Sequence, residues 1–545
     1  MHKKIVSIVT LVLITASILT GCNNHTSFKK DGNITKEIVY EINSTKNITN
    51  KVKTQEFNLG TRKINDNGNE YSYKLEGIIS APEELKERAP VVLIFHGQHG
   101  DGDNEFEKGF KYLTEALAQN NMISISVDTS INYAFEYNGV KVGEPIANER
   151  IKPLAQEILD SLQEANLGNE KGYNIDLKDK IDLDNIGLIG HSVAGQGVFK
   201  IAEEQINKGN KGIKGIISLT PANNEVIEKF PDVPAAIIVS EYDGDVIHGG
   251  ADIYNDIINH GDRKSPLGLT YLIGANHNAY NTLLGEKEFS KPEMTYGTYP
   301  DKISKEDHRK FFANYAVDNM KYFFGFENSQ SPIFDRDSLP SKMYGYETLN
   351  MVNYKDEKAL FDKNLFNKVN SKGVETKKVI DSFIQEKDSA KVFNHFGDIK
   401  ELNLMEINWK KGHSSIQIPL YDTNLKDLSK LKFRWALNSP SDLNSKDKVV
   451  SFKLSLVDSK DKEYSINISN DKVSAMKYIY GEPLTIELFD DMSFVLWSRA
   501  TPVTDTIIPL GMFNNIDLSN IKHISIEFDN TETGSIMLNE INGIK

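Results

Sequence analysis

The spacing of hydrophobic residues indicates two kinds of element in the first three fifths of the chain. Short continuous apolar runs, typical of strands buried on both faces, alternate with stretches whose apolar residues recur every three or four positions, as in helices. The strand-like runs are 91–95, 122–127, 186–189, 215–219, 235–239 and 269–273, and the helix-like stretches lie around 106–117, 151–162, 196–207 and 305–324. This alternation predicts an α/β fold with a doubly wound, mainly parallel sheet and right-handed crossovers.

The end of the chain has a different pattern. From about Lys400 the helical spacing disappears, and short alternating runs recur between turns rich in Asn, Asp, Ser and Gly. This pattern predicts an antiparallel, all-β sandwich. The stretch before it is polar and irregular, and we expect it to connect the two units.

The first residues resemble a bacterial lipoprotein signal. Lys3 and Lys4 precede an almost wholly apolar run, Ile5–Leu19, which is too short to span a membrane and fits a signal peptide. Leu19–Cys22 resembles a lipobox, in which the cysteine receives lipid and cleavage occurs before it. The sequence therefore predicts a protein anchored through Cys22 on the extracytoplasmic side of the membrane, in the cell envelope. The alternative is an ordinary signal peptide with a chance cysteine.

Composition limits the remaining possibilities. The chain has 545 residues, too many for one core, and its net charge of −14 argues against a nucleic-acid partner. Its single cysteine excludes intrachain disulfides and multi-cysteine metal sites. The expected organisation is a signal peptide at 1–22, a flexible tether at 23–50, a catalytic domain at 51–328, a connecting segment at 329–399 and a β-sandwich domain at 400–545.

One turn has the pattern of a nucleophile site. Gly190-His191-Ser192-Val193-Ala194 lies between a predicted strand and a predicted helix, which is the context expected for a serine on a tight strand-to-helix turn. Alanine stands at the last position, where glycine is preferred. The alternative is a serine in an ordinary loop.

The groups that such a serine needs follow in order along the chain. Asp243 and His277 each come directly after a later predicted strand, so all three groups are expected at one edge of the sheet. A histidine can take the serine proton, and a carboxylate can orient the histidine. Asp245, two residues after Asp243, is the other candidate for this acid. The backbone N–H groups of Val193 and Gln98 are the expected oxyanion hole.

These motifs resemble those of secreted bacterial α/β-hydrolases of the lipase and chlorophyllase-like kind, which carry a C-terminal jelly-roll sandwich that is galactose-binding-like. The matching stretches are Ile186–Ser192, Asp243–Val246, Gly274–Asn278 and Ile508–Ile521. The resemblance implies ester hydrolysis. From the residues, we expect neither a cofactor nor a metal. Relatives often read G-H-S-R-G-G-E-G at the serine, so the chain departs from them at residues 193, 194 and 196.

The other conspicuous residues receive structural interpretations. We expect His96 to orient the oxyanion loop and His191 to pack beside Ser192, whereas His99 and His248 either line the pocket or lie at the surface. The acidic run at 100–105 lacks the downstream glycine and glutamate of an EF-hand. No histidines have zinc-site spacing.

Three functions remain open. The first is a carboxylic ester hydrolase acting through a Ser192 acyl-enzyme, the second is a serine peptidase or amidase, and the third is a non-catalytic glycan-binding surface lipoprotein. The expected partners are an ester substrate, the membrane through the lipid on Cys22, and a polysaccharide bound by the sandwich. Sugar binding needs exposed aromatic rings, for which the candidates are Trp409, Trp435, Tyr478, Tyr480 and Trp497; Trp435 is expected in the core, and a packing role for the sandwich is the preferred alternative.

Overall fold

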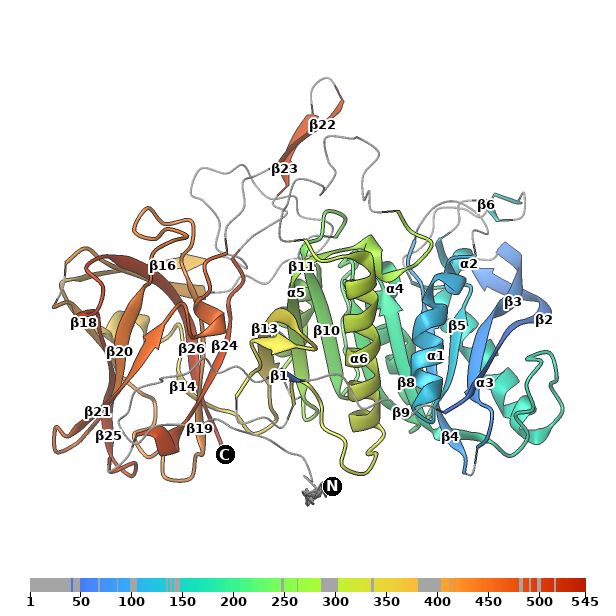
Figure 1. The fold of residues 1–545 in the computed structure, drawn as a ribbon, viewed down its shortest axis with the longest axis horizontal. Coiled ribbons are helices and arrows are strands. Elements are labelled where there is room, and N and C mark those ends of the chain that lie inside the picture. The colour runs from blue at the N-terminus through green and yellow to red at the C-terminus, as the bar shows by residue number, and fades with distance from the viewer. Residues whose placement is uncertain are drawn as a thin grey trace, which may run out of the picture.

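A computed structural model places the chain in two bodies that lie side by side, a large sheet with helices and a pair of smaller sheets (Figure 1). The predicted signal peptide, with Cys22, and most of the predicted tether lie outside the described residues. The structure describes residues 41–42, 50–66, 69–85, 87–98, 105–133, 136–137, 140–141, 148–246, 249–261, 263–285, 302–334, 338–380, 403–411, 413–479, 484–489, 492–496, 501–513 and 516–545.

The large sheet has eleven strands in the order β1-β12-β13-β11-β10-β9-β8-β4-β5-β3-β2. Its strands are β1 (Glu41–Ile42), β2 (Val52–Asp66), β3 (Asn69–Pro82), β4 (Ala89–Phe95), β5 (Ile123–Val127), β8 (Ile181–His191), β9 (Ile213–Leu219), β10 (Ala235–Tyr242), β11 (Leu267–Asn276), β12 (Lys342–Met343) and β13 (Tyr346–Asn353).

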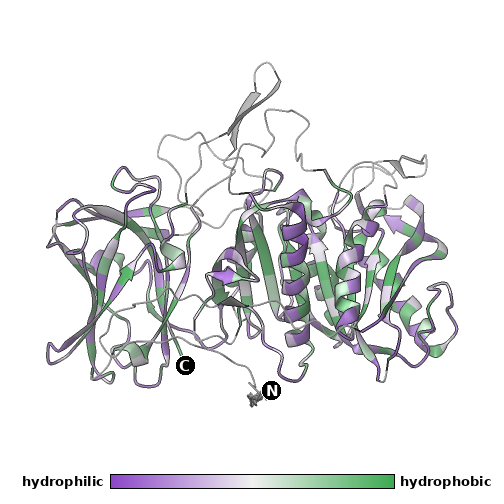
Figure 2. Cartoon of the chain, in the orientation of Figure 1, coloured by the Kyte–Doolittle hydropathy of each residue, from purple (hydrophilic) through white to green (hydrophobic). Residues whose placement is uncertain are grey.

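The middle of this sheet lies where the apolar runs predict strands. From β5 through β4, β8, β9 and β10 to β11, each strand pairs with its neighbour in parallel. Every residue of β4, β5, β10 and β11 is buried, because helices cover both faces of the sheet. Figure 2 shows these central strands as largely hydrophobic. The parallel arrangement brings their carboxyl ends to one edge.

Helices cover the two faces of the sheet as amphipathic layers. Leu113 of α1 and Phe312 of α6 share one apolar cluster, whereas Ile158 of α3, Val198 of α4 and Ile253 of α5 share another on the opposite face. Among the described residues, no helix combines the length and the apolar composition that crossing a bilayer requires. The helical elements are η1 (Phe106–Phe110), α1 (Lys111–Gln119), α2 (Ser130–Tyr133), α3 (Ile151–Leu167), α4 (Val193–Asn207), α5 (Gly249–Asn259), η2 (Asn278–Tyr280), α6 (Lys305–Phe323), η5 (Phe366–Lys368), η6 (Ser474–Met476) and η7 (Leu510–Met512).

The predicted fold class is wrong. In the part of the chain that the structure describes, strand accounts for 39% and helix for 23% of the residues, so the molecule is predominantly β rather than a doubly wound α/β-hydrolase with a mostly parallel sheet. Antiparallel β3 joins β5, antiparallel β2 joins β3, and antiparallel β13 joins β11, which makes the large sheet mixed. The error arose because continuous apolar runs dominate the sequence signal, whereas half-buried flanking strands contribute a weaker pattern.

Two antiparallel sheets form the C-terminal body. One has the order β16-β17-β26-β19-β24, with β14 also beside β26, and the other has the order β15-β18-β25-β20-β21. Their strands are β14 (Lys358–Phe361), β15 (Asn370–Lys372), β16 (Val374–Ile380), β17 (Asn403–Trp409), β18 (Ser415–Ile418), β19 (Lys430–Leu437), β20 (Ser451–Asp458), β21 (Glu463–Ser469), β24 (Thr504–Pro509), β25 (Ile521–Glu527) and β26 (Gly534–Ile544). Two hairpins stand apart, β6 (Glu136–Tyr137) with β7 (Val140–Lys141) and β22 (Leu484–Phe489) with β23 (Met492–Leu496).

Three of the five aromatic candidates for sugar binding pack in or against the hydrophobic core of the C-terminal body. Trp409 and Trp435 are fully buried, and Trp409 stacks on Phe528 with ring centroids 4.1 Å apart. Tyr478 is half-buried against the same cluster. Tyr480 and Trp497 lie outside the described residues, as do His99, His248 and most of the acidic run at 100–105.

The segment expected to connect the two bodies belongs to both of them. It supplies β12 and β13 to the large sheet and β14 to β16 to the sandwich. The joint is polar and buried: Arg434 of β19 pairs with Asp505 of β24 through two contacts of 2.8 and 2.9 Å. Asp505 also accepts the N–H of Val352 in β13 at 2.8 Å. This carboxylate therefore links the sandwich to the edge of the large sheet.

Candidate active site

The sheet brings the three predicted catalytic side chains to one edge. Ser192 directly follows β8, Asp243 directly follows β10, and His277 directly follows β11. These strands are near neighbours in the order β8-β9-β10-β11 and run in parallel. Their carboxyl ends consequently lie together, and all three side chains belong to residues no more than 2% exposed.

Ser192 has a strained and firmly held backbone. Its φ of 58° and ψ of −126° are unusual for a residue with a side chain, and such conformations persist only where the surroundings enforce them. The Ser192 N–H donates to the carbonyl of Leu219 at 3.0 Å, and its own carbonyl accepts from Gly195 at 2.8 Å and Ala222 at 3.0 Å. These bonds fix the serine at the start of α4.

Small residues make this turn possible. A Cβ on Gly190 would lie 2.1 Å from the carbonyl oxygen of Ala194, and a Cβ on Gly97 would lie 2.4 Å from the Cβ of Ser192. Both positions therefore require glycine. Ala194 is helical and fully buried, so alanine needs no special backbone freedom there. This explains why the departure from glycine at 194 is tolerated.

His277 and Asp243 form a buried pair. The Nδ1 atom of His277 lies 2.9 Å from Oδ2 of Asp243. The other carboxylate oxygen of Asp243 accepts the N–H groups of Asp245 at 3.1 Å and Val246 at 2.8 Å. With Nδ1–H donating to Asp243, the Nε2 atom of His277 is the position that can accept a proton.

Asp245 occupies a different position. Its Oδ2 lies 3.5 Å from Nε2 of His277, and its side chain is 46% exposed. Asp243 thus contacts Nδ1 of His277 and can orient the ring. Asp245 instead lies near Nε2, the atom that would take up the proton during catalysis. The geometry favours Asp243 as the orienting acid, in the arrangement that the strand end suggested.

Two further histidines support the His277 segment. His308 accepts the N–H of Asn276 at 2.8 Å and donates to the carbonyl of Ser304 at 2.7 Å, and burial lowers its pKa to about 4. The Nε2–H of His191 donates to the carbonyl of His277 at 3.2 Å, and burial lowers the pKa of His191 well below its ordinary value. Both rings are therefore neutral, structural groups near neutral pH.

The two predicted oxyanion donors lie beside Ser192. Val193 opens α4, where the first N–H groups of a helix have no partner within the helix. Gln98 is exposed and follows Gly97, the residue in close contact with Ser192. His96 orients this loop, because its Nδ1–H donates to the carbonyl of Gly97 at 2.8 Å and its Nε2 accepts the N–H of Thr129 at 2.9 Å.

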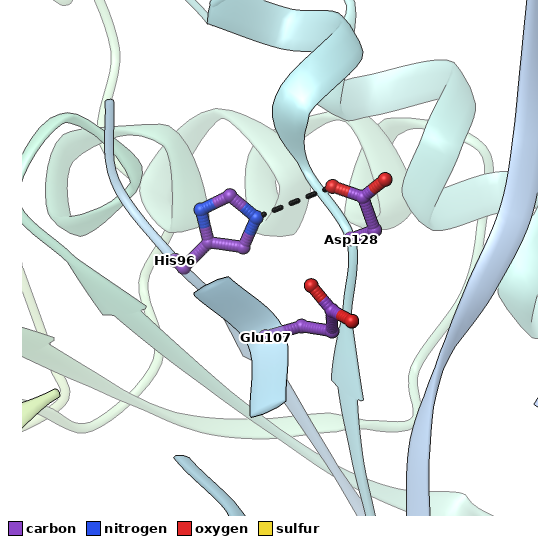
Figure 3. A group of neighbouring side chains, drawn as sticks. All are labelled: His96, Glu107 and Asp128. Carbon is purple, nitrogen blue, oxygen red and sulfur yellow. Dashed lines mark hydrogen bonds and ion pairs between the residues drawn. The ribbon is translucent and has the colours of Figure 1, made fainter. Parts of the chain in front are cut away.

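The sequence did not identify three residues near this site. Gln196 was recognised only as a departure from the family pattern, yet it ties α4 to the following loop: its amide accepts the N–H of Asn224 at 3.2 Å and donates to the carbonyl of Glu225 at 2.7 Å. Glu107 and Asp128 lie beside His96 (Figure 3). Neither has a motif, although Asp128 follows a predicted strand as the catalytic candidates do.

Comparisons with known proteins found no matching family model and no matching curated protein. The predicted membership among secreted bacterial α/β-hydrolases is therefore corrected on two grounds, the strand-rich mixed fold and the lack of a matching family model or curated protein. Nor do the comparisons support the predicted signal peptide or lipoprotein anchor. The function has to be argued from the site.

Proposed function

We propose that this chain is a serine hydrolase that cleaves carboxylic esters through an acyl-enzyme on Ser192. The observation that carries the proposal is the buried 2.9 Å contact between His277 and Asp243 at the same sheet edge as Ser192. Strained serines beside an oriented histidine are typical of nucleophilic catalysis. The proposal rests on this site and not on the fold class.

The proposed reaction has two stages. Nε2 of His277 takes the proton of Ser192 Oγ as that oxygen attacks the ester carbonyl, and Asp243 stabilises the resulting imidazolium. The N–H groups of Val193 and Gln98 stabilise the oxyanion. The tetrahedral intermediate expels the alcohol, which receives the proton from His277. Water then attacks the acyl-enzyme by the same route and releases the carboxylic acid.

Esters are favoured over amides on chemical grounds. An alcohol leaves with little assistance, whereas an amine must be protonated as it departs. The same three groups therefore need to supply less acid catalysis for an ester than for an amide. A peptidase or amidase remains the second candidate for the same residues. The glycan-binding alternative receives no support from Trp409 and Trp435, because both are core residues.

An activity-based probe tests the proposal. The purified full chain is treated with a fluorophosphonate, which reacts only with an activated serine. We expect labelling of the wild type and none of Ser192→Ala, while Ser240→Ala, which removes a buried hydroxyl at the end of β10, still labels. A folded wild type that the probe leaves unlabelled would refute the proposal. Faster turnover of aminoacyl amides than of short-chain esters would replace the esterase with the amidase.

The proposed location is the extracytoplasmic side of the membrane, with acyl chains on Cys22 as the anchor. The support is the sequence alone: a positive start, a short apolar run and a cysteine at its end. An enzyme at this location would act on esters outside the cytoplasm. Membrane fractionation, described in the Discussion, tests the location separately from the chemistry.

A further inference from the structure

Three buried ionisable side chains, those of His96, Glu107 and Asp128, lie close together (Figure 3). His96 follows β4, Asp128 follows β5, and Glu107 lies in η1. One nitrogen or oxygen atom from each side chain lies within 4.8 Å of those from the other two, and none of the three residues is more than 3% exposed. Such a cluster is costly to bury unless its charges are few and well satisfied.

The hydrogen bonds indicate how the cluster is charged. Nε2 of His96 faces both the N–H of Thr129 at 2.9 Å and Oδ1 of Asp128 at 3.4 Å. Oδ1 of Asp128 accepts the N–H of Ser130 at 2.9 Å, as expected for a carboxylate. Oε2 of Glu107 has no hydrogen-bond partner within the described part of the chain. Glu107 is therefore the group whose charge this pocket does not support.

Glu107 also lies on the element that joins the two catalytic loops. The carbonyls of Phe106 and Gly109 accept from Asn281 and Thr282, at 2.8 and 3.1 Å, and these two residues closely follow His277 in the chain. On its other side, η1 places the Glu107 carboxyl beside His96. A shift of η1 would move both the loop after β4 and the loop after β11.

We propose that Glu107 is a positioning residue: in its uncharged form it holds η1 against His96, and its ionisation loosens the loops that carry Gly97 and His277. This inference rests on the proposed function, since its consequence is a change in Ser192 chemistry. The charge repulsion comes from Asp128, which stands on the neighbouring strand end and remains ionised. Lys108 on η1 itself and His96, which follows β4, act in the opposite direction.

The electrostatics agree with this geometry. Burial and the nearby Asp128 raise the pKa of Glu107 to about 7, against smaller opposing contributions from His96 and Lys108. Burial alone would raise the pKa of Asp128 as well, but contacts with His96 and Ser130 hold it below its ordinary value. Near neutral pH, the second negative charge of the cluster therefore appears on Glu107.

A metal ion is the other use of such a cluster, and the hydrogen bonds argue against it. The lone pair of His96 Nε2 already accepts the Thr129 N–H, and Asp128 Oδ1 already accepts the Ser130 N–H. Binding a cation would break these bonds, which hold the start of α2. Within the described part of the chain, Oε2 of Glu107 is the buried oxygen of this cluster that has no hydrogen-bond partner.

The test compares the pH dependence of turnover in the wild type and Glu107→Gln. Both kcat and KM for a short-chain ester are measured from about pH 6 to pH 9. We expect kcat of the wild type to fall about tenfold above neutral pH while KM changes little, and we expect Glu107→Gln to lose this alkaline fall. The matched control is Glu105→Gln, which removes an exposed carboxylate that contacts Lys108 on the same turn; it should keep the wild-type profile.

Two further measurements keep the outcome decisive. Asp128→Asn removes the charge that adds to the effect of burial on the Glu107 pKa, so the alkaline fall should move to lower pH. This variant also serves if Glu107→Gln does not fold. Wild-type turnover without an alkaline fall, or with one that Glu107→Gln retains, overturns the inference and leaves the proposed function intact. A wild type that does not hydrolyse esters at any pH would instead contradict the proposed function. Stoichiometric divalent metal that is lost in Glu107→Gln would overturn the inference in favour of a metal site.

Discussion

Asp243→Asn is the substitution that most directly tests the proposed acid. Oδ1 of Asp243 accepts two backbone N–H groups, from Asp245 and Val246. In the variant these donors require the amide oxygen on that side, so the amide NH₂ group turns toward Nδ1 of His277. The histidine then has to carry its proton on Nε2, where it can no longer accept the proton of Ser192.

The expected loss is large because the wrong tautomer removes the base without removing any bulk. An Asp→Asn change of this kind reduces kcat on the order of 10⁴-fold, or about 5.4 kcal/mol of transition-state stabilisation. Asp245→Asn is the matched control. Its side chain is 46% exposed and lies 3.5 Å from Nε2, so solvent screens its charge and the expected change is less than about tenfold.

The assay is kcat/KM for a short-chain ester near neutral pH, with thermal unfolding of each variant measured in parallel. Folded Asp243→Asn with a loss far greater than that of Asp245→Asn supports the assignment. The reasoning is wrong if Asp243→Asn keeps more than roughly a tenth of wild-type kcat/KM. A larger loss in Asp245→Asn would transfer the role to Asp245.

Three other predictions concern stability and location. Asp505→Asn breaks the buried pair with Arg434 that joins the two bodies and should cost about 3–5 kcal/mol in urea unfolding; a change below about 1 kcal/mol would refute this role. The pKa of Glu107 is raised from 4.5 to about 7. Its uncharged form therefore stabilises the fold fully below about pH 4.5, and this stabilisation is lost as the pH rises through 7. Over this range the free energy of unfolding of the wild type should fall by up to about 3 kcal/mol relative to Glu107→Gln. Equal pH dependence in the two proteins would contradict it. Cys22→Ser should release the protein from the membrane fraction, since acyl chains contribute about 0.8 kcal/mol per buried CH₂; unchanged fractionation would exclude the anchor.

The sequence by itself determined the local features of the fold. Continuous apolar runs located β4, β10, β11 and the second half of β8, because strand segments buried on both faces are mainly apolar. The helical spacing of Leu154, Ile158 and Leu162 likewise located α3, and these three side chains are fully buried. It also placed Ser192 on a strand-to-helix turn, since the small residues around it are a local requirement of that turn.

Tertiary structure decided what depends on pairing between distant segments. The antiparallel strands β2, β3 and β13 make the large sheet mixed, and their direction is set by partners far away in the sequence. For that reason the doubly wound, mainly parallel class was wrong, and the polar stretch at 329–399, which we expected to be a connection, contributes strands to both bodies.

The same distinction applies within the site. Residue types and strand ends suggested Ser192, His277 and an acid, and they favoured Asp243 over Asp245 only because Asp243 lies nearer the strand end. Only the fold shows which carboxylate contacts Nδ1, because that contact joins the ends of two neighbouring strands. Glu107 carries no motif at all, since what makes it unusual is burial beside Asp128 and His96, and burial next to residues from other strands is a property of the folded chain.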